Sequence, residues 1–331
     1  MRLINIRQDR PLDVICLGRA GVDLYAEEPD VDMIDVAGFK KFVGGSPANI
    51  AVAIARQGGR AGIISCVSDD SLGRFVCHSL EGFGVDLQGM KIDKNGSRTS
   101  LAVTELKSSG CEVILYRNHA SDLTLRPEQM DPDYIRQAKI LLVTGTALSE
   151  SPSREATLAA MQYARVAGTV VVLDLDYRAY SWQSPEESAV IYTIAAGQSD
   201  IVIGNREEFD VLEYLNGKHC TDDDHTAQQL LKGRTKIILL KAGEKGSKVY
   251  CADGQTFEQA IFPVDVIKPF GSGDSYAGTA LLALIQGDSL KQAVRKGSAA
   301  AAINISRNTC TEAMPTTEEL NAFLATHTEK H

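Results

Sequence analysis

The 331-residue sequence lacks the features that point to a membrane or nucleic-acid-binding protein. No apolar run approaches the ~20 residues that a membrane helix needs. The longest such stretch, around Leu281, is interrupted by Gln286 and Gly287. There is no basic block, and the net charge of −9 disfavours binding to phosphate backbones. We therefore expect neither membrane nor nucleic-acid partners.

Paired cysteines, metal-ligand spacings and targeting signals are also missing. The seven cysteines include no Cys-x-x-Cys pair, and the six histidines are scattered. The segment before residue 11 is polar and lacks the apolar core of a signal peptide. These absences favour reduced thiols and a cytoplasmic location.

Two nucleotide-binding motifs are incomplete, and no linker divides the chain. Gly18-Arg19-Ala20-Gly21 lacks the third glycine of a dinucleotide fingerprint. Gly243-Glu244-Lys245-Gly246 is not a Walker A loop, which requires Gly-x-x-x-x-Gly-Lys-Ser/Thr. If ATP binds, its phosphates are held in another way. Without repeats or a tract rich in Pro, Gly or Ser, residues 1–331 are expected to form a single domain.

From residue 139 onward, strand-like and helix-like segments alternate. The predicted strands cover 140–144, 170–173, 201–203 and 237–240, with helices between them at 154–166, 186–196 and 226–232. This alternation predicts an α/β fold with a mostly parallel sheet covered by helices on both faces. Ligands bind beyond the carboxyl ends of such strands. The polar residues at those ends are Asp174, Asp176, Arg178, Asn205, Glu208, Lys241, Gly243 and Gly246.

A hairpin pattern occupies residues 99–106 and 112–117, around Ser108-Ser109-Gly110. Because no helix pattern lies beside it, the hairpin is expected to stand outside the main sheet, as a lid, a dimer contact or both. Arg117 at its end is a candidate clamp for a substrate carboxylate, or a solvated lid side chain.

Two earlier segments carry candidate substrate-binding residues. Asp23 follows a strand predicted at 14–17, where either a substrate-binding carboxylate or a turn cap is common. Gly44 and Gly45 precede Ser46, the predicted N-cap of a helix over 48–57. Asn49 on the first turn could bind a polyol through its amide. An ordinary helix start explains these residues nearly as well.

The segment from Lys268 to Gly278 joins a predicted strand, 262–267, to an apolar helix, 276–285. Gly271, Ser272 and Gly273 allow a sharp turn that leaves the first helical N–H groups free to bind an anion. Asp274 in the same turn could accept a proton from a hydroxyl group while a phosphoryl group moves. The alternative is an N-capping Asp on a core helix.

Three motifs at matching spacing resemble the signatures of the ribokinase-like (PfkB) sugar kinases. They are Gly44-Gly45-Ser46-Pro47-Ala48-Asn49, Asn205-x-x-Glu208 and Gly271-Ser272-Gly273-Asp274. The resemblance covers nearly the whole chain. It implies a three-layer α/β/α fold with a mostly parallel central sheet and a small β lid, from about 20–43 and 97–120. An exposed lid favours a homodimer.

The resemblance also implies residue roles, with ATP and Mg²⁺ as cofactors. Asp274 matches the base, and the N–H groups of Gly271, Ser272 and Gly273 match an anion hole. The sugar-holding positions match Asp23, Gly44, Gly45 and Asn49. Asn205 and Glu208 match a magnesium-phosphate motif that acts through water, although Glu208 could be a plain capping-box acid. The positions around the nucleotide match Lys241, Gly243, Gly246 and Asn304.

A closer likeness concerns the substrate. Asp174-Leu175-Asp176-Tyr177-Arg178 resembles the strand-end motif of the family branch that phosphorylates 2-keto-3-deoxygluconate, with Asp176 where Asn is usual. An acid sugar needs a cation for its carboxylate, and Arg117 and Arg178 are the candidates. A kinase for another sugar such as fructose, or a sugar-sensing protein of the same fold, remains the alternative.

Lys268 departs from the family pattern. Many members have Asp-Thr-Thr before the anion hole, and that Asp helps to hold a potassium ion. Because Lys268 replaces the carboxylate with an ammonium group, a monovalent cation would be repelled. We hypothesise that the ammonium takes its place and supports the anion-hole loop; a surface lysine without a role is the alternative.

Overall fold

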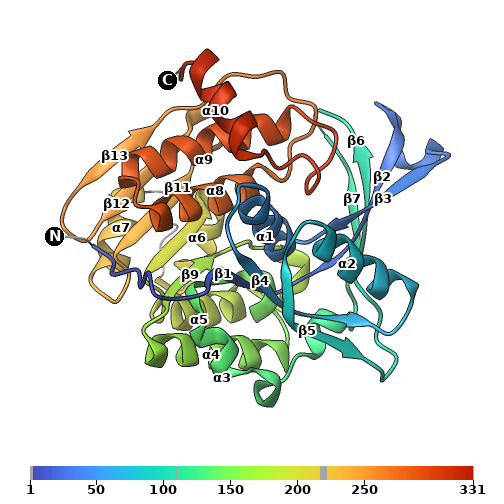
Figure 1. Cartoon of the computed structure of the whole chain (residues 1–331), viewed down its shortest axis with the longest axis horizontal. Helices are drawn as coiled ribbons and strands as arrows, with labels where there is room; N and C mark the ends of the chain where they lie inside the picture. Colours follow the sequence, from blue (N-terminus) through green and yellow to red (C-terminus); the bar gives the residue numbers. More distant parts are fainter. Residues whose placement is uncertain (1–2, 109, 217–221, 331) are drawn as a thin grey trace.

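The computed structural model describes residues 3–108, 110–216 and 222–330. Its main element is a nine-stranded sheet of order β13-β12-β11-β10-β9-β8-β1-β4-β5 (Figure 1). The strands from β11 to β5 in that order run parallel, and β12 and β13 are antiparallel at one edge. Their bounds are β1 Leu12–Leu17, β4 Ala61–Ser68, β5 Asp86–Asp93, β8 Ala138–Thr144, β9 Val170–Asp174, β10 Ile201–Asn205, β11 Ile237–Lys241, β12 Ser247–Cys251 and β13 Thr256–Gln259.

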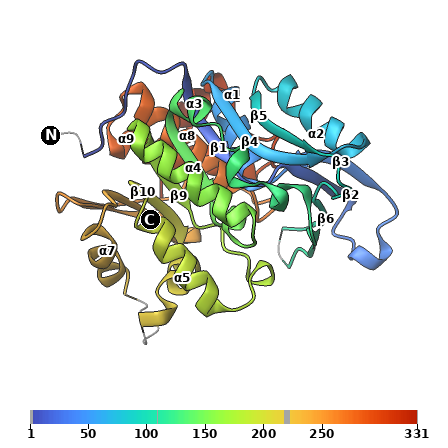
Figure 2. The same ribbon diagram turned by 90° about the horizontal axis from the view of Figure 1, so that it is seen from below.

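Helices cover both faces of this sheet, as the two views in Figures 1 and 2 show. One core cluster packs α1 (Ser46–Arg56), α2 (Ser71–Gly82), α8 (Ser272–Gln286) and α9 (Leu290–Ile305) against the sheet. The other cluster packs α3 (Pro132–Arg136), α4 (Ser153–Ala167), α5 (Pro185–Ala196), α6 (Arg206–Leu212) and α7 (Asp223–Leu231). The central strands β8 and β9 are buried along their whole length and are mostly apolar, because helices cover both of their faces.

A separate four-stranded sheet, of order β3-β2-β6-β7, forms the lid. Its strands are β2 Gly21–Pro29, β3 Phe39–Gly44, β6 Leu101–Leu106 and β7 Val113–Tyr116. Strands β2 and β6 are parallel, whereas β3 and β7 pair antiparallel at the edges. The lid projects to one side of the three-layer body in Figure 1. The predicted α/β architecture and the hairpin outside the main sheet are therefore confirmed.

The remaining elements are short or peripheral. The last helix, α10 (Thr317–Thr326), packs on α9. Short 3₁₀ turns at 33–35, 121–124, 127–129, 145–148, 179–181, 214–216 and 243–245 connect the longer elements. Across the described ranges, no helix combines the length and apolar character needed to cross a bilayer.

Two local predictions are wrong. Residues 262–267 form no strand: the nearest pairing is a single bridge between Ile261 and Lys330, and Phe262 packs instead on the cluster of α9 and α10. Ser46 is not the N-cap of α1 but its first residue; Gly45, with φ 105°, occupies the cap position. Apolar sequence alone does not make a strand, because a strand also needs a neighbour with free backbone groups.

Candidate active site

The carboxyl ends of three adjacent strands meet the N-terminus of α8. Registers of β9, β10 and β11 place Asp174, Asn205 and Lys241 at one edge of the sheet. The Lys241 Nζ atom lies 3.4 Å from an Asp174 carboxylate oxygen and 3.9 Å from one of Glu208. A β-carbon added to Gly273 on the first turn of α8 would lie 3.3 Å from the same Nζ. The ammonium group therefore lies between the buried carboxylates and the start of the helix.

Asp274 is held by two donors from α1. The Ser46 hydroxyl donates to Asp274 Oδ1 at 2.7 Å, and the Asn49 amide donates to Oδ2 at 2.8 Å. Burial and the nearby Asp176 raise the pKa of Asp274, whereas these two donors and Lys241 lower it in part. Asp274 is therefore no N-cap of its helix; it is a partly buried carboxylate with increased affinity for a proton.

The anion-hole turn has the geometry that its sequence predicts. Gly271 caps α8 in the left-handed conformation, with φ 87°. A β-carbon there would approach Cys310 Sγ to 2.6 Å and Asn304 Oδ1 to 2.8 Å, so only glycine fits. The first backbone hydrogen bond of the helix runs from the Ser275 N–H to the Gly271 carbonyl. The N–H groups of the preceding residues therefore lie ahead of the helical ladder, at its positive end.

Burial and neighbouring charges shift the pKa values of Asp174 and Lys241. Asp174 is buried, and burial together with neighbouring carboxylates raises its pKa to about 7, even though Lys241 lowers it. Burial lowers the pKa of Lys241, but Asp174 and Glu208 more than offset this, so the net shift is upward. Lys241 therefore remains protonated at neutral pH, next to the turn that precedes Asp274.

A cavity of about 690 Å³ lies beside the anion-hole turn. Polar residues line one end of it: Lys241, Gly243, Glu244, Gly246, Ser272 and Gly273. The remainder is largely apolar, with Phe262, Pro263, Val264, Val266, Ala301, Ala302 and Ile305. An apolar slot that opens onto helix N–H groups and an ammonium suits a flat base joined to phosphates.

Asn304, expected near the nucleotide, is not among the residues that line this cavity. Its side chain is fully buried, and its Nδ2 atom donates to the Cys310 carbonyl at 2.9 Å. Its Oδ1 atom accepts from Lys268 at 2.7 Å. Its neighbours on α9, Ala301, Ala302 and Ile305, line the cavity instead. Asn304 therefore contacts the loop behind the anion hole.

Lys268 is completely buried, which excludes the alternative of a surface lysine. Its Nζ atom donates to the Phe270 carbonyl at 2.6 Å and to Asn304 Oδ1 at 2.7 Å. No carboxylate lies within 4.0 Å of this ammonium in the part of the chain that the structure describes. Burial lowers the pKa of Lys268, while Cys310 and Asp274 offset part of that effect. A buried cation held by two neutral oxygens lies directly behind the anion-hole turn.

The sequence placed Asp23 in a loop after the first strand. In the structure it lies within β2 of the lid. Its carboxylate packs on Gly44: a β-carbon at Gly44 would lie 2.0 Å from Asp23 Oδ2. Asp23 Oδ1 is buried without a hydrogen-bond partner among the described residues, and Arg19 Nη2 is 3.7 Å away. Burial raises the pKa of Asp23, whereas Arg19 and Tyr25 lower it in part. Asp23 Oδ1 has a nearby positive charge but no hydrogen-bond donor among the described residues, so it could accept a hydrogen bond from a ligand hydroxyl.

Position 45 also accepts only glycine. A β-carbon there would lie 2.3 Å from the Arg19 carbonyl oxygen, in addition to the positive φ. The two glycines thus bring β3 and α1 close to the segment that leads into β2.

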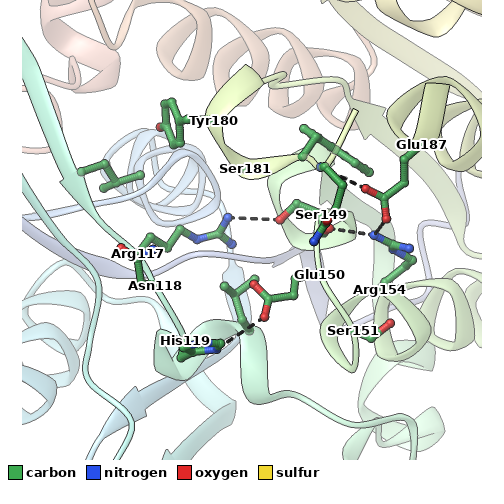
Figure 3. Close-up of a pocket in the computed structure, with 14 residues that line it drawn as sticks. Arg117, Asn118, His119, Ser149, Glu150, Ser151, Arg154, Tyr180, Ser181 and Glu187 are labelled. Carbon is green, nitrogen blue, oxygen red and sulfur yellow. Dashed lines mark hydrogen bonds and ion pairs between the residues drawn. The ribbon is translucent and has the colours of Figure 1, made fainter. Parts of the chain in front are cut away.

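The two candidate arginines have different surroundings. Arg178 is half exposed and pairs with Asp176 at 2.8 Å; Asp176 raises the pKa of Arg178. Arg117 is buried and lines a second cavity, of about 630 Å³ (Figure 3). Its guanidinium bonds Asp122 Oδ2 at 2.5 Å and the Thr146 carbonyl at 3.0 Å. Arg117 is therefore not a solvated lid side chain, and its charge is already paired.

Asn205 and Glu208 form a capping box at the start of α6. Asn205 Oδ1 accepts the Glu208 N–H at 2.9 Å, and Glu208 Oε2 accepts the Asn205 N–H at 2.7 Å. Glu208 Oε1 also accepts the Tyr177 N–H at 3.2 Å. Each carboxylate oxygen keeps a further lone pair, which suits a contact to magnesium-bound water. No group of three or more acidic, His or Cys side chains is arranged to hold a metal directly in the described ranges.

Sequence reasoning missed three contributors to the site. Ser46 donates to Asp274 instead of capping its own helix. Thr311, in the loop after α9, contacts Asn49. Tyr25 of the lid stacks on Phe270 of the anion-hole turn, with ring centroids 5.7 Å apart. Periodicity and residue spacing do not predict contacts between distant segments. For the Ser46–Asp274 contact, the serine of the Gly-Gly-Ser-Pro motif was the one available signal.

Comparison with known proteins identifies relatives over the full length of the chain. A 5-dehydro-2-deoxygluconokinase of Photobacterium profundum is 60% identical over 326 residues, which is 98% of this chain and 98% of that protein. A 5-dehydro-2-deoxygluconokinase of Geobacillus kaustophilus is 46% identical over 328 residues, 99% of this chain and 98% of that protein.

Solved structures match as well. The fructokinase of Xylella fastidiosa with bound ATP has a TM-score of 0.85 at 25% identity, and covers 95% of this chain and 98% of its own. A Vibrio cholerae fructokinase double mutant, with bound fructose, ADP and potassium ion, has a TM-score of 0.82 at 27% identity, over 96% and 100%. The model of the pfkB family of carbohydrate kinases matches residues 12–317. This chain therefore belongs to the pfkB family of carbohydrate kinases.

Proposed function

We propose that this chain is an ATP-dependent kinase that phosphorylates the 6-hydroxyl group of 5-dehydro-2-deoxy-D-gluconate in myo-inositol breakdown. The observation that carries the proposal is the Asp274 carboxylate, held by Ser46 and Asn49 next to the N-terminus of α8. The names of the two full-length relatives support the substrate. Two segments also resemble motifs of 5-dehydro-2-deoxygluconokinases and support the same substrate: Asp174-Leu175-Asp176-Tyr177-Arg178 and Lys268-Pro269-Phe270-Gly271-Ser272-Gly273-Asp274.

The proposed reaction needs a base and an electrostatic clamp. Asp274 accepts the proton of the sugar hydroxyl as the γ-phosphoryl group of ATP moves in line onto its oxygen. The raised pKa of Asp274 suits it to take up this proton. The N–H groups of Gly271, Ser272 and Gly273, together with Lys241, offset the negative charge on the moving group.

ATP is assigned to the 690 Å³ cavity, with its base among the apolar residues and its phosphates towards Lys241 and Gly273. Gly243 and Gly246 form the turn along its polar end. Magnesium bound to the phosphates would neutralise part of their charge and contact Glu208 and Asn205 through water.

The sugar is assigned to the space between the lid and Asp274. Asp23, Gly44, Gly45 and Asn49 surround it from β2, β3 and α1. Of the two arginines, Arg178 is the better placed to bind the carboxylate, because its charge affects Asp274 directly and its head group is half exposed. Arg117 would have to exchange part of its bonding to Asp122.

The proposal extends to the domain organisation and location, to Lys268 and to the lid. The chain acts as one kinase domain in the cytoplasm. Lys268 replaces a monovalent cation behind the anion hole. The lid pairs with that of a second copy through its outer face, where Ile114 and Tyr116 of β7 are 37% and 60% exposed. An exposed apolar edge strand is otherwise a liability.

Replacement of Asp274 by Asn tests the mechanism. Asp274→Asn should keep the fold and lose roughly two to four powers of ten in kcat, the usual contribution of a general base. Asp253→Asn, in the exposed turn between β12 and β13, is the matched control and should keep full turnover. Near-normal turnover of Asp274→Asn would refute the role of Asp274.

A substrate panel tests the reaction itself. At equal ATP, kcat/KM should be highest for 5-dehydro-2-deoxy-D-gluconate when compared with 2-keto-3-deoxygluconate and fructose. A preference for another sugar would leave a kinase but reject the substrate. Absence of transfer to every sugar, with sugar binding intact, would favour a sensing protein.

Gly44→Ala tests the sugar site. The added methyl group must displace the Asp23 carboxylate. Loss of a hydrogen bond to a charged group costs about 1.5–3 kcal/mol, so KM for the sugar should rise about tenfold or more, with KM for ATP unchanged. Gly82→Ala at the end of α2, where a β-carbon has open space, is the control. An unchanged KM in Gly44→Ala would remove Asp23 from the sugar site.

The Lys268 assignment predicts independence from monovalent cations. Turnover in potassium should equal turnover when potassium is exchanged for tetramethylammonium, because the buried ammonium already supplies the positive charge. A many-fold loss on exchange would contradict the assignment. Lys268→Met, which removes the charge, should lower kcat even in saturating potassium.

A lid mutation tests the dimer. Ile114→Glu combined with Tyr116→Lys should convert the protein to a monomer in sedimentation or light-scattering measurements. Val190→Glu, at a comparably exposed apolar position on α5, should leave the oligomeric state unchanged. A wild-type monomer at micromolar concentration would reject the proposal outright.

A further inference from the structure

Thr311 lies behind the residue that holds the proposed base, in a loop with no sequence motif of its own. Its side chain is fully buried, between α9 and α10. Its Oγ1 atom lies 2.7 Å from Asn49 Oδ1 and 2.5 Å from the Val43 carbonyl oxygen. We propose that Thr311 is a positioning residue for Asp274, acting through the Asn49 amide. This inference rests on the kinase function proposed above.

The chain of contacts is short and has a definite direction. Thr311 contacts the oxygen end of the Asn49 amide, and the nitrogen end donates to Asp274 Oδ2 at 2.8 Å. An ionised carboxylate has only acceptor atoms, so Asn49 must present its NH₂ group to it. The Asn49 oxygen then needs a donor on its far side, and the Thr311 hydroxyl is the side chain that supplies one.

The alternative orientation of Asn49 is unfavourable for the proposed reaction. Rotation of the amide by half a turn would place its oxygen against Asp274 Oδ2, where two acceptors repel each other. The contact with the ionised Asp274 therefore sets the orientation of the Asn49 amide. Thr311 fixes the position of the Asn49 side chain, so that its NH₂ group stays within hydrogen-bond distance of Asp274 Oδ2.

The contact joins three segments of the active site. Val43 is the residue before Gly44 at the end of β3, Asn49 lies on the first turn of α1, and Asp274 lies on the first turn of α8. A single buried hydroxyl thus connects the edge strand β3 of the lid with the proposed base. A misplacement of a reacting group by about 1 Å can cost up to a hundredfold in rate.

The ionisation of Asp274 gives a readout that plain packing would not move. The Asn49 donor lowers the pKa of Asp274 against the opposing effect of burial. Without Thr311 this donor is lost for part of the time, so the pKa of Asp274 should rise. Activity of a general base falls as the pH drops through its pKa, so the acid limb of the kcat profile should move to higher pH.

Thr311→Val, which keeps the shape and removes the hydroxyl, is the test. It should lower kcat about ten- to a hundredfold, shift the acid limb upward and leave KM for the sugar within about twofold. Thr311→Ser should restore both kcat and the pH profile. Thr157→Val is the matched control: Thr157 is equally buried and donates to the Ser153 carbonyl on α4, away from this network. It should change stability only.

A double-mutant cycle tests whether Thr311 acts on Asp274 through Asn49. If Thr311 acts through Asn49, Thr311→Val should have no further effect on kcat in an Asn49→Ala background. If Thr311→Val does not fold, Thr311→Ala removes the same hydroxyl and is read in the same way. A folded hydroxyl-free variant with wild-type kcat and an unmoved acid limb would overturn the proposal, and so would additive effects in the cycle.

The outcome is separable from that of the proposed function. A wild-type protein that phosphorylates no sugar rejects the kinase proposal. In that case the Asp274 carboxyl can still be titrated by NMR in the wild type and in Thr311→Val. An upward shift in the variant supports the positioning role, and equal pKa values reject it.

Discussion

The site depends on the placement of one ammonium group among four carboxylates. Lys241 lies within 4 Å of Asp174 and Glu208, and its charge also affects Asp176 and Asp274. Without it, Asp174 at the end of β9 and Glu208 on the helix after β10 would bring like charges together in a buried region, at a high electrostatic cost. With it, the carboxylates tolerate their burial, while the pKa values of Asp174 and Asp274 stay raised by burial and neighbouring carboxylates. The same ammonium faces the start of α8, where an anion is favoured.

The anion-hole turn is supported from behind by a second buried cation. Lys268 has neutral partners only, a costly arrangement for a charge so far from water. Its bond to the Phe270 carbonyl orients the peptide that leads directly into Gly271. Asn304 and Cys310 fill the space that a side chain at Gly271 would need. Charge and packing thus fix the same turn.

The lid is not independent of this turn. Tyr25 of β2 stacks on Phe270, and Phe42 of β3 lies edge-on to Tyr25 at 5.5 Å. The Tyr25 hydroxyl donates to Cys310 Sγ at 3.1 Å. Asp23, two residues before Tyr25 in the same strand, packs on Gly44. Movement of the lid would therefore be transmitted to the turn before Asp274, the proposed anion hole, as well as to the proposed sugar site.

Sequence patterns were sufficient for the architecture. The apolar runs at 140–144, 170–173, 201–203 and 237–240 all became buried parallel strands, because a strand covered on both faces needs apolar residues throughout. Antiparallel β12 and β13, the lid strands β2 and β3, and the edge strand β5 were not predicted as strands. Strands β3, β5 and β13 are partly exposed and carry many polar residues, so they resemble loops until a neighbouring strand is present. Strands β2 and β12 mix polar and apolar residues although they are mostly buried.

The residue types of the candidate site also came from the sequence, since glycines at a turn and a carboxylate on a first helical turn are local features. Their partners did not. Ser46 and Thr311 contact residues far away in the chain, and Lys268 bonds Asn304 as well as the nearby Phe270 carbonyl. Asn304 turns towards the core and does not line the 690 Å³ cavity. The sequence by itself determined which groups are available and on which elements they lie. Only the tertiary structure decided which of them meet, because hydrogen bonds and charge interactions depend on distances that chain order does not specify.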